Sequence, residues 1–162
     1  MKKVQTELPE IKLIGITART NNANEINPSL AKITPTVQKY FHSNLPAKIP
    51  HRTKPETTFC VYTDYENGIT GDYTYFIGEE VSSFEKVPDG FETLSIPTQV
   101  YAKFTTEPGP MPNVVMGAWQ RIWQMTEQDF GGPRRFSADF EVYDERASDP
   151  QNAALDVYIG IK

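Results

Sequence analysis

The sequence predicts an α+β fold: two tandem βαββ units form a largely antiparallel, curved sheet with two main helices and a central ligand cleft. Stretches of β-forming residues and two helical stripes follow the order strand, helix, strand, strand, and that order occurs twice. No close sequence repeat accompanies it. The length of 162 residues favours a single domain over 1–162, with pseudo-repeats at about 10–81 and 90–162. A cleft between two such units is a natural ligand site.

The first unit is predicted from one helical stripe and three β-rich stretches. The helix can begin at Asn27-Pro28 or at Thr34-Pro35, since Pro is favoured in a first helical turn. Asn67-Gly68 is a strong turn signal that joins two strands into a hairpin. The predicted elements are a strand at 11–20, a helix whose stripe is Leu30, Ile33, Val37, Tyr40 and Phe41, and strands at 57–64 and 72–81.

The second unit contains the clearest helix of the chain. Asn113 is a good helix cap, and Gly131-Gly132-Pro133 ends the helical region. The stripe on this helix consists of Val115, Trp119, Ile122, Trp123 and Thr126. The strands predicted around it lie at 91–96, 98–106, 136–145 and 154–161.

Composition and charge exclude several kinds of protein. A net charge of −5 argues against direct nucleic-acid binding and mildly favours cationic ligands. Cys60 is the sole cysteine, which excludes an internal disulfide, and its apolar strand context predicts a buried, inert thiol. His42 and His51 do not form metal-ligand spacing with it, so we expect no metal and no cofactor. Without a signal or membrane-spanning segment, we expect a cytoplasmic protein that does not bind membranes.

The stretch FSADFEVYDE at 136–145 holds the main candidate functional residue. Strand alternation places Asp139, Glu141 and Tyr143 on one face. If that face is enclosed, Glu141 becomes a fixed negative charge among aromatic rings, which suits an organic cation. The alternative is that Glu141 faces water on an ordinary amphipathic strand, because Glu is rarely buried.

Aromatic residues, 12% of the chain, are the candidate walls of such a site. We name Tyr143, Trp119 and Trp123 first, because they lie close to Glu141 or on the second helix. Each of them is also explained by packing against the sheet. Two charged pairs, Glu79-Glu80 and Arg134-Arg135, are predicted to be solvated. Strand tyrosines that could point into the same site are Tyr62, Tyr75 and Tyr101.

Several motifs resemble the effector-binding domain of gyrase-inhibitor-like proteins, of the AraC-type regulator Rob and of MerR-type multidrug regulators. The resemblance covers about 73–162 well and implies tandem βαββ halves around a cleft. It also implies that the Glu of the FE-x-Y motif, here Glu141, attracts lipophilic cations. The matching pieces are Tyr75-Phe76-Ile77-Gly78, Val87-Pro88-Asp89-Gly90-Phe91, Ile96-Pro97, Tyr101-Ala102-Lys103-Phe104, Trp119, Ile122-Trp123, Phe140-Glu141-Val142-Tyr143-Asp144 and Asp156-Val157-Tyr158-Ile159-Gly160-Ile161.

The chain differs from the regulators in one respect. About ten residues precede the first predicted strand, so we expect no DNA-binding domain and a resemblance to stand-alone members carried on integron cassettes. Its partners would be a lipophilic cationic small molecule and either a second copy or a separate DNA-binding chain.

Three functions are compatible with the sequence. The first is a stand-alone binding protein and ligand sensor. The second is a hydrolase of electrophilic small molecules, in which Glu141 activates water with help from Tyr143 or Tyr101. The third is an inhibitor of a larger enzyme through protein contact. We rank them in that order.

Overall fold

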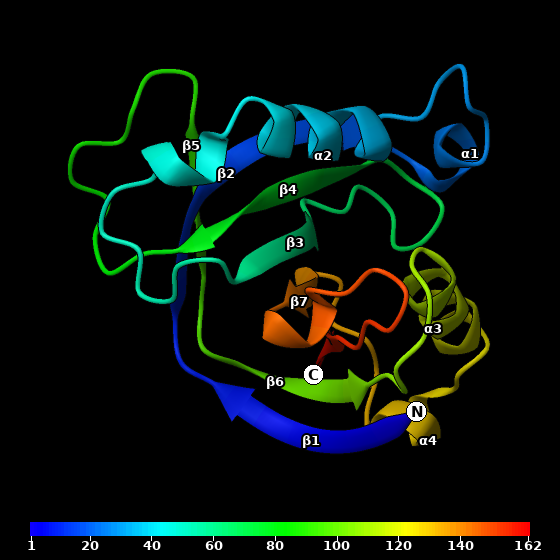
Figure 1. The fold of residues 1–162 in the computed structure, drawn as a ribbon. Helices are drawn as coiled ribbons and strands as arrows, with labels where there is room; N and C mark the ends of the chain where they lie inside the picture. Colours follow the sequence, from blue (N-terminus) through cyan, green and yellow to red (C-terminus); the bar gives the residue numbers. More distant parts are fainter.

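The computed structural model describes residues 1–162 and contains one eight-stranded sheet in which all neighbouring strands are antiparallel (Figure 1). It confirms the predicted α+β class with two main helices. The strands are β1 (Lys2–Leu8), β2 (Ile11–Thr20), β3 (Thr58–Thr63), β4 (Tyr73–Glu80), β5 (Glu92–Ile96), β6 (Gln99–Thr105), β7 (Ala138–Tyr143) and β8 (Asp156–Ile161). The helices are α1 (Asn22–Glu25), α2 (Ile33–His42), α3 (Asn113–Trp123) and α4 (Glu127–Phe130), with short 3-10 turns η1 (Leu45–Lys48) and η2 (Glu145–Ala147). None of the helices is long and apolar enough to cross a membrane.

The sheet is pseudo-symmetric. Equivalent strands of the two units are met in the same order when the sheet is followed inward from either edge. The strand order runs β1-β6-β8-β7-β3-β4-β2-β5, so the two βαββ units meet where β7 pairs with β3. The outer strands are exchanged between the units: β1 pairs with β6 of the second unit, and β5 pairs with β2 of the first. Each unit therefore lends an edge strand to the other, which ties the halves together through backbone hydrogen bonds.

The two central strands share a short sequence pattern that was not recognised from the sequence alone. Phe59-Cys60-Val61-Tyr62 in β3 corresponds to Phe140-Glu141-Val142-Tyr143 in β7. The match is confined to these four positions, of which three are identical. In the register of the two strands Cys60 lies directly opposite Glu141, so the charged residue of one unit faces the thiol of the other.

Helix α2 begins where a carboxylate from α1 reaches it. Glu25 accepts hydrogen bonds from the backbone N–H groups of Lys32 and Ile33, at 2.8 and 3.2 Å. Free N–H groups and the helix dipole favour a negative charge at this end. The start near Thr34-Pro35 is therefore correct, and the start at Asn27-Pro28 is wrong.

Helix α3 also differs from its predicted bounds. Pro112 occupies the cap position, and Asn113, the predicted cap, is the first helical residue. The helix ends at Trp123, and Thr126 begins the separate short helix α4 with a capping box to Asp129. Strand β1 was not predicted at all, because Lys2–Leu8 is mostly polar and largely exposed.

Both main helices cover the same face of the sheet, one over each unit (Figure 1). Tyr40 of α2 packs with Ile14 and Ile77 of the first unit, and Ile122 of α3 packs with Val157 and other residues of the second. The opposite face carries a third apolar cluster that includes Phe59, Val61, Phe76, Tyr101 and Phe140. The helices leave β3 and β7 uncovered between them, which positions the site described below.

A buried ion pair connects the loop before β7 to the sheet. Asp139 is fully buried and accepts hydrogen bonds from Arg134 at 2.6 Å, from the Tyr65 hydroxyl at 2.6 Å and from the Gly160 N–H at 2.8 Å. The guanidinium of Arg134 also lies 4.3 Å from the ring centre of Phe136. Arg134 is thus a structural residue, and its prediction as a surface residue was wrong.

A second charged residue that was predicted to be solvated is buried within the first unit. Glu79 of β4 was predicted to be solvated, but it is 1% exposed. Its partner is Arg52, at 3.5 Å, and the bridge between Arg52 and Val81 holds that arginine over the strand. Burial raises the pKa of Glu79, and the nearby Arg52 acts in the opposite direction.

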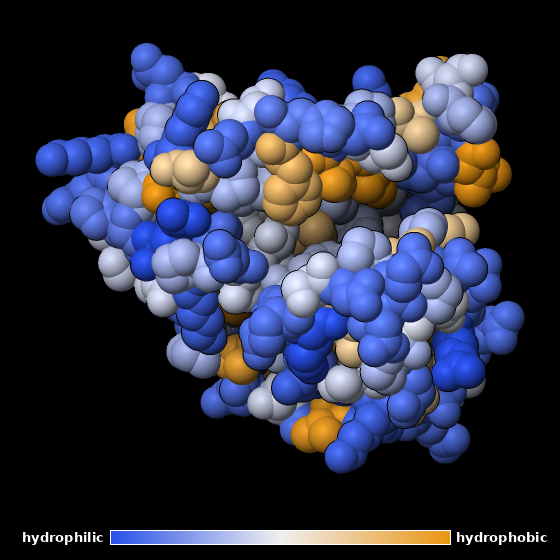
Figure 2. Space-filling model, in the orientation of Figure 1, coloured by the Kyte–Doolittle hydropathy of each residue, from blue (hydrophilic) through white to orange (hydrophobic).

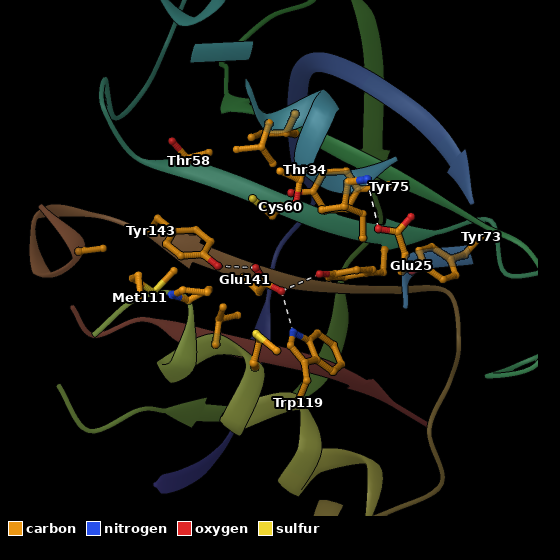
Figure 3. Close-up of a pocket in the computed structure, with 18 of the residues that line it drawn as sticks. Glu25, Thr34, Thr58, Cys60, Tyr73, Tyr75, Met111, Trp119, Glu141 and Tyr143 are labelled. Carbon is orange, nitrogen blue, oxygen red and sulfur yellow. Dashed lines mark hydrogen bonds between the residues drawn. The ribbon is translucent and has the colours of Figure 1, made fainter. Parts of the chain in front are cut away.

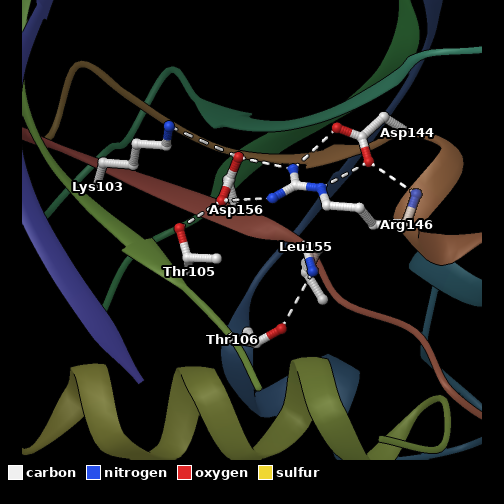
Figure 4. A network of polar contacts seen from close by, with 7 residues as sticks. All are labelled: Lys103, Thr105, Thr106, Asp144, Arg146, Leu155 and Asp156. Carbon is white, nitrogen blue, oxygen red and sulfur yellow. Dashed lines mark hydrogen bonds and ion pairs between the residues drawn. The ribbon is translucent and has the colours of Figure 1, made fainter. Parts of the chain in front are cut away.

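A polar network fixes the turn after β7 (Figure 4). Arg146 of η2 binds Asp144 and Asp156, each at 2.8 Å, and Asp156 also accepts from Thr105 at 2.7 Å. The hydrogen bond from Arg146 lowers the pKa of Asp144. Burial acts to raise the pKa of Asp156, but its hydrogen bonds to Arg146 and Thr105 outweigh burial and lower it. The network joins η2 to β8 and β6.

The buried pair of Arg134 and Asp139 predicts a difference between two adjacent arginines. Replacing Arg134 by Ala leaves a buried carboxylate without its cation, so we expect the free energy of unfolding to fall by about 3 kcal/mol. Urea denaturation measures it. Arg135→Ala is the matched control, since Arg135 is exposed, and it should change stability by less than about 0.5 kcal/mol. Equal effects of the two substitutions would contradict the structural role of Arg134.

Candidate small-molecule pocket

A pocket of about 1100 Å³ lies between α2 and α3, over the paired strands β3 and β7. Figure 2 shows the hollow between the two halves of the molecule, with hydrophobic side chains along its upper wall. Drug-sized ligands occupy pockets of roughly 300–1,000 Å³. The volume is therefore sufficient for a bulky organic molecule.

Helix α2 lines one side of the pocket, and α3 with the two residues before it lines the other. The lining residues recur at the same spacing in both units, so they occupy equivalent positions on the two sides. Polarity differs between some equivalent positions, as between Gln38 and Met116. The corresponding pairs are Ile33 and Met111, Thr34 and Pro112, Val37 and Val115, Gln38 and Met116, and Phe41 and Trp119.

Glu141 lies on the floor of this pocket and is 3% exposed (Figure 3). Its Oε2 accepts hydrogen bonds from the Tyr62 hydroxyl at 2.7 Å and from the Trp119 indole N–H at 2.6 Å. Its Oε1 accepts one from the Tyr143 hydroxyl at 2.6 Å. Tyr62 and Tyr143 occupy equivalent positions of the two units, so each unit supplies one hydroxyl to the same carboxylate.

The environment of Glu141 sets its protonation behaviour. Burial raises the pKa of this carboxyl group, and the hydrogen bonds from Tyr143, Tyr62 and Trp119 oppose that rise. Burial, reinforced by the charge of Glu141, also raises the pKa of the Tyr62 and Tyr143 hydroxyls well above the usual value. Both hydroxyls therefore keep their protons and remain donors. Burial followed by the charge of Glu141 raises the pKa of Cys60, which keeps the thiol neutral.

The pocket carries an excess of negative charge. Its only lining cation is Arg134, which is already paired with Asp139. Glu25 lies in the wall that the first unit forms. The pKa of Tyr73 is raised mainly by burial, then by the charge of Glu25 and then by that of Glu141. The lining carboxylates are Glu25, Glu56, Glu141, Asp144 and Glu145. A cation entering the pocket would meet a favourable potential.

Most of the candidate site residues predicted from the sequence line the pocket. Trp119, Trp123, Tyr62, Tyr75 and Tyr143 do so together with Glu141. Trp123 is 57% exposed and lies at the rim.

Tyr101 does not reach the pocket, contrary to the prediction. It is fully buried on the opposite face of the sheet, with its ring 5.2 Å from Phe140 and 5.7 Å from Tyr158. The reason is strand alternation: its neighbour Ala102 faces the helix side, so Tyr101 must point away.

Sequence reasoning also missed other residues of the pocket, among them Tyr73 and Glu25. Tyr73 lies two positions before Tyr75 on β4 and therefore on the same face, so alternation was a usable signal. Glu25 lies in the polar stretch at 21–27, and nothing in its local pattern indicated a pocket. Phe41 of α2 does line the first-unit wall, whereas Tyr40 is in the core.

The comparisons with known proteins agree with this architecture. A family model described as integron-associated effector binding protein (Cass2) matches residues 6–161. YobU of Bacillus subtilis (strain 168) is 29% identical over 157 residues, which cover 97% of this chain and 96% of YobU. The integron cassette protein VCH_CASS2 from the mobile metagenome of Vibrio cholerae is 25% identical with a TM-score of 0.78, covering 99% of this chain and 95% of its own.

A second solved structure, SAV2435 bound to tetraphenylphosphonium, shares the fold with a TM-score of 0.80 at 14% identity, over 100% of this chain and 94% of that chain. The family model covers nearly all of the sequence, including both helices and the strand that carries Glu141. This chain therefore belongs to the family of integron-associated effector binding proteins.

Proposed function

We propose that this protein binds lipophilic organic cations in the pocket between α2 and α3, with Glu141 as the counter-charge, and that it acts as a ligand sensor. The observation that carries the proposal is the state of Glu141. The carboxylate is almost fully buried, yet its three partners are neutral donors, and none of the chain's ion pairs includes it. A buried charge without a counter-ion is the feature that a cationic ligand would complete.

The energetics favour a cation over a neutral ligand. An unpaired carboxylate in an apolar site costs several kcal/mol even after relaxation, and a bound cation would offset part of that cost. Aromatic ring faces add about 0.5–2 kcal/mol per well-placed contact with a cation. Trp119, Tyr73 and Tyr75 are rings of this kind in the pocket wall. Met111 and Met116 are flexible lining residues, which suits ligands of varied shape.

The relatives support the same proposal. The family is described as effector binding, and the structure of SAV2435 is bound to tetraphenylphosphonium, a lipophilic cation. A ligand sensor needs a partner that responds when the pocket is occupied. For this chain we propose that the partner is either a second copy or a separate DNA-binding chain.

Removing the charge of Glu141 tests the proposal directly. In Glu141→Gln we expect the affinity for tetraphenylphosphonium to fall by at least about tenfold, because the isosteric amide keeps the shape of the site and loses its charge. The quenching of tryptophan fluorescence measures binding, since the only two tryptophans, Trp119 and Trp123, both line the pocket.

Glu145→Gln is the matched control for that experiment. Glu145 also lines the pocket but is exposed at its rim, so the same chemical change in a solvated carboxylate should alter affinity by less than about twofold. If wild type and Glu141→Gln bind the cation with equal affinity, Glu141 is not the counter-charge and the proposal fails.

The raised pKa of Glu141 predicts a pH dependence of binding. A cation binds the ionised carboxylate, so affinity should be highest above the pKa of Glu141 and should decline as the pH falls through that pKa. Because burial raises that pKa, the decline should begin above the ordinary glutamate pKa of about 4.3. Titrations with tetraphenylphosphonium, whose charge does not depend on pH, measure this. Glu141→Gln should show no such decline, and a flat wild-type profile would contradict the prediction.

A further inference from the structure

The hydrogen bonds already made by Glu141 limit which cations it can accept. A carboxylate offers about four acceptor positions. Two donors occupy Oε2, namely the Tyr62 hydroxyl and the Trp119 indole, and the Tyr143 hydroxyl occupies one position on Oε1. About one acceptor position is therefore left for a ligand, and it belongs to Oε1.

Two of the three internal donors, Tyr62 and Trp119, are held in place by ring packing, and Tyr143 packs against the apolar clusters of both units. The Tyr62 ring meets the rings of Trp119, Tyr75 and Tyr73 in edge contacts, with centroids 5.1, 5.5 and 5.7 Å away. Trp119 in turn packs on Trp123 at 6.3 Å. A ligand N–H that displaced one of these donors would leave a buried hydroxyl or indole N–H unpaired, which is unfavourable.

The partly exposed carboxylate of Glu25 in the pocket wall offers no better acceptor. Oε2 of Glu25 accepts from the Thr20 hydroxyl at 2.6 Å and from the Lys32 N–H at 2.8 Å, and Oε1 accepts from the Ile33 N–H at 3.2 Å. The hydroxyl oxygens of the tyrosines beside Glu141 carry no formal charge. Glu141 and Glu25 thus each have most of their lone pairs in use.

This combination treats two kinds of cation differently. A protonated primary amine brings three N–H donors, which lose their bonds to water on entry and find about one vacant position on Glu141. A quaternary ammonium or phosphonium ion has no donors to satisfy. It interacts with the charge of Glu141 and with the ring faces of Trp119, Tyr73 and Tyr75, neither of which requires a free lone pair.

We infer that the pocket selects cations by their lack of N–H donors: it takes permanently charged, donor-free cations in preference to protonated amines of the same skeleton. The inference rests on the proposed function and names its ligand class. The specificity-determining residue is Tyr143, because its hydroxyl occupies the oxygen that would otherwise be the most available to an ammonium group.

A methylation series tests the inference at constant charge. The series consists of phenylbutylammonium, its dimethyl derivative and its trimethyl derivative, which carry three, one and no N–H donors. All three are cationic at about pH 7, because the pKa of an alkyl amine is about 10.4. Isothermal calorimetry measures their affinities. For the wild type we expect affinity to rise at each methylation, with about a tenfold or larger difference between the first and last members.

Two variants that each remove one hydroxyl separate donor effects from the apolar contribution of the added methyl groups. Tyr143→Phe releases a position on Oε1, so the preference for the trimethyl member over the primary amine should fall by about threefold or more. Ser148→Ala removes a hydroxyl of the pocket lining that makes no hydrogen bond to Glu141, and it should keep the wild-type preference. A change in the ionisation of Glu141 affects all three ligands alike, so the affinity ratio is the readout.

The outcomes distinguish the inference from the function on which it rests. If the wild type binds all three ligands equally, or binds the primary amine best, the inference is wrong and cation binding stands. The same conclusion follows if Tyr143→Phe keeps the wild-type ratio. If neither the series nor tetraphenylphosphonium binds the wild type, the proposed function fails and the inference fails with it.

Discussion

The structure depends on one buried carboxylate that is held by both halves of the chain. Glu141 accepts a hydroxyl from Tyr62 of the first unit and from Tyr143 of the second, together with the indole N–H of Trp119. A negative charge with 3% exposure is stable only where such donors surround it. The requirement fixes the register of β3 against β7, because a slip of one residue would turn Glu141 to the other face.

The rest of the fold keeps these two strands in position. The exchanged edge strands β1 and β5 bind each unit to its neighbour, and Asp139, on the same face as Glu141, anchors the loop before β7 through Arg134. The two carboxylates of β7 have different roles because their partners differ. Asp139 has an arginine and needs no further cation, whereas Glu141 has neutral donors and faces a large pocket. Sequence alternation alone does not separate those roles.

Local patterns predicted the features that depend on spacing along the chain. The alternation of 136–145 placed Glu141 and Tyr143 on one face, and the stripe on the second helix brought Trp119 to the same pocket. The errors concern pairing between distant segments. Tyr101 points away because of its phase against β8, Glu79 is buried under Arg52, and β1 is ordered by pairing with β6 although its own sequence is polar. Each of these outcomes is decided by a partner that single-strand periodicity does not reveal.

The pocket contains one central charge and not two, because its nearly symmetric halves differ at the central position of the strand pair. Cys60 holds the position in β3 that Glu141 holds in β7, and the two residues face each other across the strand pair. Side chains in such cross-strand positions have Cβ atoms about 4.5–5.5 Å apart. Two carboxylates at that separation, in a buried site, would not both ionise, and one would retain a proton. A neutral thiol at position 60 therefore leaves Glu141 free to ionise and lets the donors of both units converge on it. The symmetric fold supplies the walls and the hydroxyls, and the single asymmetric substitution at its centre gives the pocket one central anionic site.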